Sequence, residues 1–166
     1  MSQRPTPIGV SFVCMGNICR SPTAEAVMRH LVKQAGLDHA IAVDSAGTGS
    51  WHVGEPPDRR SQAVGKRRGI PLGGEARQFT RSDFARFDYV LAIDREIEAE
   101  LHQLAPNPEA RAKVHLLRKF DPSSPVDADV PDPYYGGPEG FEHVFDLCEA
   151  SCRGLLDYLR KTHGLG

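Results

Sequence analysis

The change from a strand pattern to a helix pattern near the start of the chain restricts the fold more than any other feature. Residues 8–13 (IGVSFV) form an apolar run with the length of a buried strand. Apolar residues between Ala24 and Ala35 then follow at helical spacing, and Gly36 ends that pattern. A buried strand that leads through a short loop into a helix is typical of strand–helix–strand units, which build parallel sheets.

The rest of the chain repeats this alternation. Further strands are predicted at 41–48, 88–94 and 113–120, and helices at 61–69, 95–105 and from Phe141 to Leu159. Residues 121–138 are rich in Pro, Asp and Gly, so we expect a long loop there, and loops of this length are commonly functional. The chain has 166 residues and no linker-like stretch, which predicts a single domain over 1–166.

Alternating strands and helices predict a parallel sheet with helices on both faces and right-handed crossovers. In such folds, ligands bind beyond the carboxyl ends of the strands, where the chain order reverses. Cys14 directly follows the first predicted strand. We therefore expect the loop after Cys14 to lie at the functional edge of the sheet.

The segment CMGNICRSP after the first strand has the residues of an anion-binding loop. Ser21 is a favourable N-cap and Pro22 suits a first helical turn, so a helix should begin directly after Arg20. A loop that enters a helix turns several backbone N–H groups into one concavity, and the helix dipole adds positive charge there. Gly16 and Asn17 tolerate the left-handed backbone that such a loop needs. The loop is predicted to hold a tetrahedral oxyanion.

Cys14 and Arg20 give this loop its chemistry. Five residues separate them, which lets the chain curl around one phosphate and return the guanidinium to the side that faces the thiol. In this positive environment Cys14 is expected to lose its proton readily and to act as a nucleophile towards phosphorus. The spacing alone arises by chance in many chains. Its position between a buried strand and a helix favours this interpretation over a small buried hydrophobic residue.

Composition narrows the class of protein. The net charge of −2 at pH 7 gives no support to broad nucleic-acid binding. No apolar run approaches the roughly 18 residues of a membrane span, and residues 1–7 lack the order of a signal peptide. We therefore expect a cytoplasmic protein that does not bind membranes. Its four cysteines are then free thiols, metal ligands or catalytic groups rather than disulfides.

Four blocks of the sequence resemble one known family. The signature of the low-molecular-weight protein tyrosine phosphatases is similar to VCMGNICRSPTAEAV, and later blocks are similar, in the same order, to DSAGTGSWHVGEPPDRRS, ARQFTRSDFARFDYVLAID and DPYYGGPEGFEHVFDLCEASC. The similarity spans nearly the whole chain. It implies a flavodoxin-like three-layer α/β sandwich, with a four-stranded parallel sheet of order 2-1-3-4. It also implies a metal-independent enzyme, without a cofactor, that hydrolyses phosphotyrosine through a phosphocysteine intermediate.

The resemblance also assigns roles to individual residues. It implies that Cys14 is the nucleophile, that Arg20 binds the phosphate and that Asp132 is the general acid and then the base. Asp127 and Asp129 are rival carboxylates, and a solvated acidic loop is the alternative for all three. The resemblance further assigns the phosphate-binding loop to Met15, Gly16, Asn17, Ile18 and Cys19, and the support of this loop to Ser21 and Asp94. It assigns the wall of the substrate pocket to Trp51, Tyr134 and Tyr135. For these three aromatic residues, core packing is the alternative.

Comparison with related enzymes narrows the choice of substrate class. The bacterial protein arginine phosphatases carry threonine at the position of Ile18 and a single aromatic residue before the glycine in the loop of the general acid, so Ile18 and the pair Tyr134–Tyr135 favour phosphotyrosine. Thioredoxin-coupled arsenate reductases need two further cysteines near the middle of the chain, and none lies between Cys19 and Cys148. A non-catalytic phosphopeptide-binding module is the remaining alternative, for which a complete set of nucleophile, arginine and acid would be unnecessary.

The other cysteines have different expected roles. Cys19 is predicted to form a disulfide with oxidised Cys14, which would protect Cys14 from further oxidation, and the alternative is an inert buried thiol. Cys148 and Cys152 lie four residues apart on an apolar helix face. They are expected to be core thiols rather than metal ligands, because no partner spacing accompanies them.

Two positions depart from the family pattern. Gly74 and Ile97 stand where familiar members have histidine and asparagine, in the surroundings that steady the phosphate loop. The support of the loop, and the part that Asp94 plays in it, are therefore left open by the sequence.

The expected partners follow from the same chemistry. Phosphotyrosine-containing proteins are the predicted substrates, and phosphate, sulfate or vanadate should bind as active-site anions. Nucleic acids and membranes are not expected as partners. A monomer or a weak homodimer is predicted, because Trp51 and the tyrosine pair could bury themselves in a self-contact.

Overall fold

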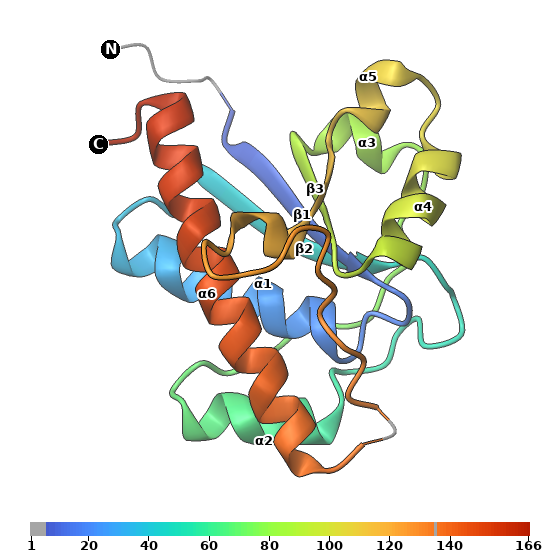
Figure 1. Cartoon of the computed structure of the whole chain (residues 1–166), viewed down its shortest axis with the longest axis vertical. Helices are drawn as coiled ribbons and strands as arrows, with labels where there is room; N and C mark the ends of the chain where they lie inside the picture. Colours follow the sequence, from blue (N-terminus) through green and yellow to red (C-terminus); the bar gives the residue numbers. More distant parts are fainter. Residues whose placement is uncertain (1–5, 135) are drawn as a thin grey trace.

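The computed structural model describes residues 6–134 and 136–166, and these form three layers (Figure 1). The middle layer is a parallel sheet whose strands are β1 (Ile8–Cys14), β2 (Ile41–Gly47), β3 (Tyr89–Ala92) and β4 (Val114–Leu116). Their order is β2-β1-β3-β4, which confirms the predicted sheet order and fold class. All of β1 is buried, because it has a strand on each side and helices on each face.

Helices cover both faces of the sheet (Figure 1). One face packs against α1 (Arg20–Gln34) and α6 (Pro138–His163), with α2 (Arg59–Arg67) beside α6. The other face packs against α3 (Asp83–Arg86), α4 (Arg95–Leu104) and α5 (Pro108–Arg111). Alternate side chains of β1 serve the two layers, since Val10 and Phe12 join the core under α1 and α6 whereas Val13 joins the core under α4.

The fourth strand is shorter than predicted. Only Val114–Leu116 pairs with β3, and the following residues form the 3-10 helix η1 (Leu117–Phe120). A strand through Phe120 was the wrong prediction, because Leu117 is buried in the core under α6 and the Phe120 ring lies 5.3 Å from the ring of Tyr158 on α6. Gly154 permits this approach, since a Cβ there would lie 1.7 Å from the carbonyl oxygen of Phe120.

Two helices were not predicted at all. Both α3 and α5 contain four residues, which is too short for a helical period to show in the sequence. Asn107 caps α5 by accepting a hydrogen bond from the N–H of Ala110 at 2.8 Å. In the described part of the chain, no helix combines the length and the apolar composition needed to cross a membrane.

The carboxyl ends of the strands bring the functional segments together. The loops after β1 and β2 are joined by two backbone hydrogen bonds, from Thr48 to the Cys14 carbonyl and from Gly49 to the Met15 carbonyl, both at 2.9 Å. Gly47 allows this contact, because a Cβ there would lie 2.7 Å from the carbonyl oxygen of Met15. The predicted functional edge is therefore the place where these loops meet.

Candidate active site

The phosphate loop, defined here as residues 14–20, connects β1 directly to α1. Asn17 adopts a left-handed backbone with φ 58°, and its N–H donates to the sulfur of Cys14 at 3.2 Å. The hydroxyl of Ser21 lies 2.9 Å from the same sulfur. Both groups can donate a hydrogen bond to a thiolate, so they stabilise negative charge on Cys14.

The start of α1 differs from the prediction in one respect. The helix begins at Arg20, Cys19 occupies the N-cap position, and no side chain caps the helix there. Ser21 as N-cap was therefore wrong, because its hydroxyl is engaged by Cys14 and by the amide of Asn17. Pro22 lies in the first turn as predicted, where its missing N–H removes no helical hydrogen bond.

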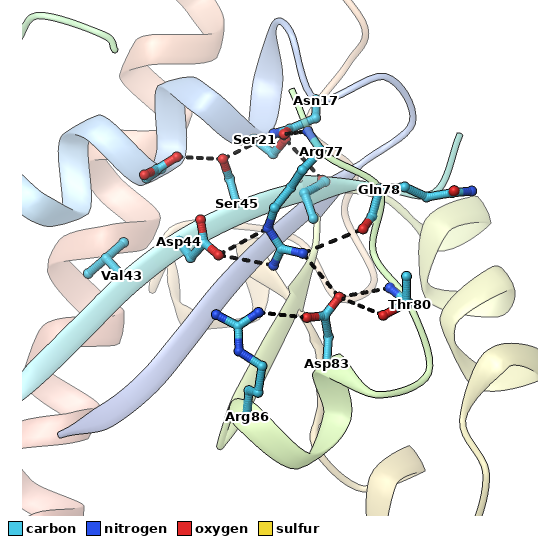
Figure 2. A network of polar contacts seen from close by, with 12 residues as sticks. Asn17, Ser21, Val43, Asp44, Ser45, Arg77, Gln78, Thr80, Asp83 and Arg86 are labelled. Atoms are coloured by element: carbon cyan, nitrogen blue, oxygen red, sulfur yellow. Dashed lines mark hydrogen bonds and ion pairs between the residues drawn. The ribbon is translucent and has the colours of Figure 1, made fainter. Parts of the chain in front are cut away.

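The side chain of Asn17 connects the phosphate loop to its surroundings (Figure 2). Its amide nitrogen donates to the hydroxyl of Ser21 at 2.9 Å and to that of Ser45, on β2, at 3.0 Å. Its amide oxygen accepts a hydrogen bond from the N–H of Arg77 at 3.0 Å. Ser45 in turn donates to the carboxylate of Glu25 on α1 at 2.5 Å. A continuous polar network thus leads from the Cys14 sulfur to Glu25.

Arg77 anchors the outer part of this network (Figure 2). Its guanidinium pairs with Asp44 at 3.0 Å and with the buried Asp83 at 3.1 Å. Burial tends to raise the pKa of Asp83, but hydrogen bonds from Thr80 and Arg77 outweigh it and hold the pKa below its usual range. Arg77 thus carries its main-chain N–H to Asn17 from a position fixed by two carboxylates. Sequence reasoning missed the contribution of Ser45, Arg77 and Asp83, although all three lie in quoted blocks.

Arg20 is almost completely buried, with 5% of its surface exposed. Its guanidinium donates to the Asp94 carboxylate at 2.7 Å and to the Val130 carbonyl at 3.0 Å. Burial acts to lower the pKa of Arg20, but the negative charges of Cys14 and Asp94 outweigh it and raise the pKa, so the guanidinium stays charged. Asp94, which was predicted only to support the loop, is thus in direct contact with Arg20.

A pocket of about 300 Å³ opens above the phosphate loop. Cys14 and Arg20 line it together with most of the loop, Trp51, Tyr134 and Asp132. The carboxylate of Asp132 lies 4.0 Å from the Arg20 guanidinium. His52 also lines the pocket and was missed by sequence reasoning, because nothing in its neighbourhood in the sequence distinguishes it. The pocket brings together a cysteine sulfur, a guanidinium cation and a carboxyl group.

The three candidate acids of the 121–138 loop face different surroundings. Asp132 lies in the pocket with Cys14. Asp129 instead pairs with Arg95, at 3.2 Å, and Asp127 lines a separate pocket beside β4. Of the three carboxylates, the structure places Asp132 in the pocket that Cys14 lines.

The predicted aromatic wall lies at the pocket mouth. Trp51 is 64% exposed and Tyr134 is 37% exposed, so core packing is excluded as their role. Tyr135 lies outside the described residues. Arg60 of α2, which sequence reasoning missed, donates to the Tyr134 carbonyl at 3.0 Å and lies 5.2 Å from the centre of its ring. The same guanidinium lies 4.5 Å from the Phe141 ring, which ties this wall to α6.

Comparison with known proteins agrees with this geometry. The family model of the low molecular weight phosphotyrosine protein phosphatases matches residues 9–164. This chain belongs to that family. The predicted enzyme class, a protein tyrosine phosphatase, is confirmed at the level of the family.

Relatives of this phosphatase cover nearly the whole chain. A low molecular weight protein-tyrosine-phosphatase of Streptomyces coelicolor is 52% identical over 92% of this chain and 93% of its own length. The crystal structure of a protein tyrosine phosphatase from Entamoeba histolytica, with Hepes in the active site, has a TM-score of 0.90 at 39% identity and covers 94% of this chain and 99% of that one. A Drosophila arginine phosphatase is also similar, with a TM-score of 0.84 at 36% identity, covering 91% and 97% of the two chains.

The two departures from the family pattern have local explanations in this phosphatase. Gly74 has φ +82°, a conformation that favours glycine, and it lines a pocket together with Glu25, which is paired with Arg29 at 2.7 Å. Ile97 buries its side chain in the core under α4, and its N–H donates to the Asp94 carboxylate at 2.8 Å. Asp94 therefore caps α4 with one oxygen and binds Arg20 with the other.

The cysteines beyond Cys14 are buried free thiols in this phosphatase. Burial, followed by the charge of Asp58, raises the pKa of Cys19 to about 12. Cys148 and Cys152 are fully buried in the core between α6 and the sheet, as predicted. Among residues 6–134 and 136–166, no cluster of three or more His, Cys, Asp or Glu side chains is arranged to hold a metal ion.

Proposed function

We propose that this phosphatase hydrolyses phosphotyrosine in proteins through a phosphocysteine formed on Cys14. The observation that carries the proposal is the meeting of the Cys14 sulfur, the Arg20 guanidinium and the Asp132 carboxyl group in one pocket of about 300 Å³. The polar network behind Asn17 and the aromatic mouth of the pocket support it.

In the first step, the phosphate of the substrate lies in the phosphate loop at the N-terminus of α1, where the helix dipole favours an anion. The thiolate of Cys14 attacks phosphorus, and the bond from phosphorus to the phenolic oxygen breaks. Asp132 donates its proton to the departing oxygen, so a neutral phenol leaves. Arg20 binds the phosphoryl oxygens, where negative charge spreads in the transition state.

In the second step, the same carboxylate acts as a general base. Asp132 accepts a proton from a water molecule, which attacks the phosphocysteine. The sulfur–phosphorus bond breaks, inorganic phosphate is released and the thiolate of Cys14 is restored. The two groups that point at its sulfur, the Asn17 N–H and the Ser21 hydroxyl, make the thiolate a better leaving group.

The preference for phosphotyrosine rests on the mouth of the pocket. Trp51 and Tyr134 provide two aromatic walls for a flat ring, and Ile18 adds an apolar side chain inside. An arginine phosphatase is the alternative, since the similar Drosophila protein is an arginine phosphatase. The sulfonate group of Hepes is a tetrahedral anion, so its presence in the active site of the Entamoeba protein supports tetrahedral anions as ligands of this loop.

Turnover by the purified protein tests the proposal. We expect hydrolysis of p-nitrophenyl phosphate and of phosphotyrosine peptides, competitive inhibition by vanadate and phosphate, and full activity in EDTA. Phosphoserine and phosphoarginine peptides serve as matched substrates and should be hydrolysed much more slowly. A faster release of phosphate from phosphoarginine would reject the tyrosine assignment. Binding of phosphotyrosine peptide without any turnover would instead indicate a binding module.

We also propose that Cys19 protects the nucleophile. When a peroxide oxidises Cys14 to a sulfenic acid, the thiol of Cys19 would displace water and form a disulfide. The high pKa of Cys19 keeps that thiol protonated, so the reaction should be slow at neutral pH and faster at higher pH. Cys19→Ser should therefore lose activity to peroxide irreversibly, whereas dithiothreitol should restore the wild type. Equal recovery of the two proteins would contradict this role.

A further inference from the structure

The segment from Asp121 to Tyr134, called the acid loop here, is held by the residues that directly follow β3. The N–H of Val130 donates to the carbonyl of Ile93 at 2.9 Å, and its carbonyl accepts the hydrogen bond from Arg20. Val130 is fully buried. The backbone of the acid loop is thus fixed at Val130, two residues before Asp132.

Asp129 provides a second attachment, next to the first. Its carboxylate accepts hydrogen bonds from the N–H of Arg95 at 2.9 Å and from the guanidinium of Arg95 at 3.2 Å. Arg95 is the first residue of α4, so the carboxylate also lies at the positive end of that helix. The guanidinium of Arg118 donates to the carbonyl of Asp129 at 3.0 Å. Burial acts to raise the pKa of Asp129, but the hydrogen bonds from Arg95 outweigh it and lower the pKa, so this carboxylate stays ionised.

The side chain of Asp132 has weaker attachments of its own. It accepts a hydrogen bond from the N–H of Tyr134, which belongs to the same loop, and its other oxygen lies 4.0 Å from Arg20. The side chain is 39% exposed. Pro131, which has a fixed φ, connects it to Val130. The position of Asp132 in the pocket therefore depends on where residues 129–131 are held.

The Arg95–Asp129 pair is too exposed to matter much for global stability, because exposed ion pairs contribute little. A small free energy is enough, however, to select between nearby positions of a surface loop. We propose that the Arg95–Asp129 pair is a latch that positions Asp132 for proton transfer to the leaving group. Arg95 and Asp129 are thus positioning residues, and the inference rests on the proposed role of Asp132 as general acid.

The basicity of the leaving group distinguishes a role in positioning Asp132 from a purely structural role. A phenolate that is a weak base departs with little help from an acid, whereas a strongly basic one needs the proton. In a series of substituted phenyl phosphates, the logarithm of kcat/KM should therefore fall more steeply with the phenol pKa once the latch is lost. A variant that merely has a smaller folded fraction would lower kcat/KM for every substrate by the same factor.

The experiment compares Asp129→Ala and Arg95→Ala with the wild type. Asp129→Ala removes all the hydrogen bonds that Arg95 donates to the carboxylate, whereas Arg95→Ala keeps the one from the N–H, so the first should have the larger effect. For Asp129→Ala we expect kcat/KM on phenyl phosphate to fall by roughly 10- to 100-fold, and that on p-nitrophenyl phosphate by less than about threefold. Asp127→Asn is the matched control, since it removes one charge from the same loop and asparagine tolerates the φ of 55° found there.

A second comparison tests whether the change in slope acts through Asp132. In an Asp132→Ala background, adding Asp129→Ala should leave the slope unchanged, because the acid that the latch positions is already absent. Slopes equal to that of the wild type in both latch variants would overturn the latch. A wild type that hydrolyses none of the phenyl phosphates would instead overturn the proposed function, so the two failures are distinguishable.

Discussion

Cys14→Ser is expected to abolish hydrolysis of p-nitrophenyl phosphate, with kcat falling by on the order of 10⁴-fold or more. The reason is the weaker acidity of an alcohol. The N–H of Asn17 and the hydroxyl of Ser21 would still point at the substituted atom, but they cannot ionise an alcohol at neutral pH as they stabilise a thiolate. Initial rates measured over a range of protein concentrations check the loss.

The binding of anions provides the control for this variant. Arg20 and the backbone of the phosphate loop are unchanged, so calorimetry should still detect binding of phosphate to Cys14→Ser. When the wild type is quenched with acid during turnover of a substrate, the peptide that contains Cys14 should carry phosphate. The same peptide of the Cys14→Ser variant should not. A wild-type rate in the variant would reject Cys14 as the nucleophile.

Asp132→Ala should slow turnover by roughly 10²- to 10⁴-fold. The variant has no proton to give to the departing phenol and no base for the water that attacks phosphocysteine. Arg20 and the thiolate remain, so binding of the substrate should change much less than kcat. Steady-state rates on a phosphotyrosine peptide, measured over a range of peptide concentrations, give both kcat and KM.

The neighbouring carboxylate Asp127 is the matched control for this prediction. It belongs to the same loop but lines a different pocket, beside β4. Asp127→Asn should therefore keep a rate close to that of the wild type. A loss in Asp127→Asn as large as in Asp132→Ala would show that the loop's total charge, rather than one acid in the pocket, supports turnover.

Local patterns in the sequence predicted most of the fold, because those patterns reflect burial. Buried β1 and the apolar face of α1 showed as an uninterrupted apolar run and a helical period. The predicted strand at 113–120 wrongly included η1 for the same reason. Leu117 and Phe120 are apolar because they pack against α6, and burial in a strand or in a 3-10 helix leaves apolar residues in the sequence alike.

The site was predicted where the chemistry of a residue stands out within one segment or where the family resemblance assigns that residue a role. Cys14, Arg20 and Asp132 meet in the pocket as expected. Ser45 and Arg77 were missed, because their contacts to Asn17 join residues that are far apart in the chain. Asp129 was considered only as a rival acid, since nothing near it in the sequence indicates Arg95, 34 residues earlier, as its partner.

The way in which Asn17 is bound has a consequence for the affinity of the site. Both hydrogens of its side-chain amide and the amide oxygen are engaged, by Ser21, Ser45 and Arg77, while its backbone N–H already points at the sulfur. These hydrogen bonds involve no anion, so they favour the curved shape of the phosphate loop whether or not an anion is bound. The conformational entropy of ordering the loop is lost when the chain folds, so it is not subtracted again from the free energy of each encounter with a substrate.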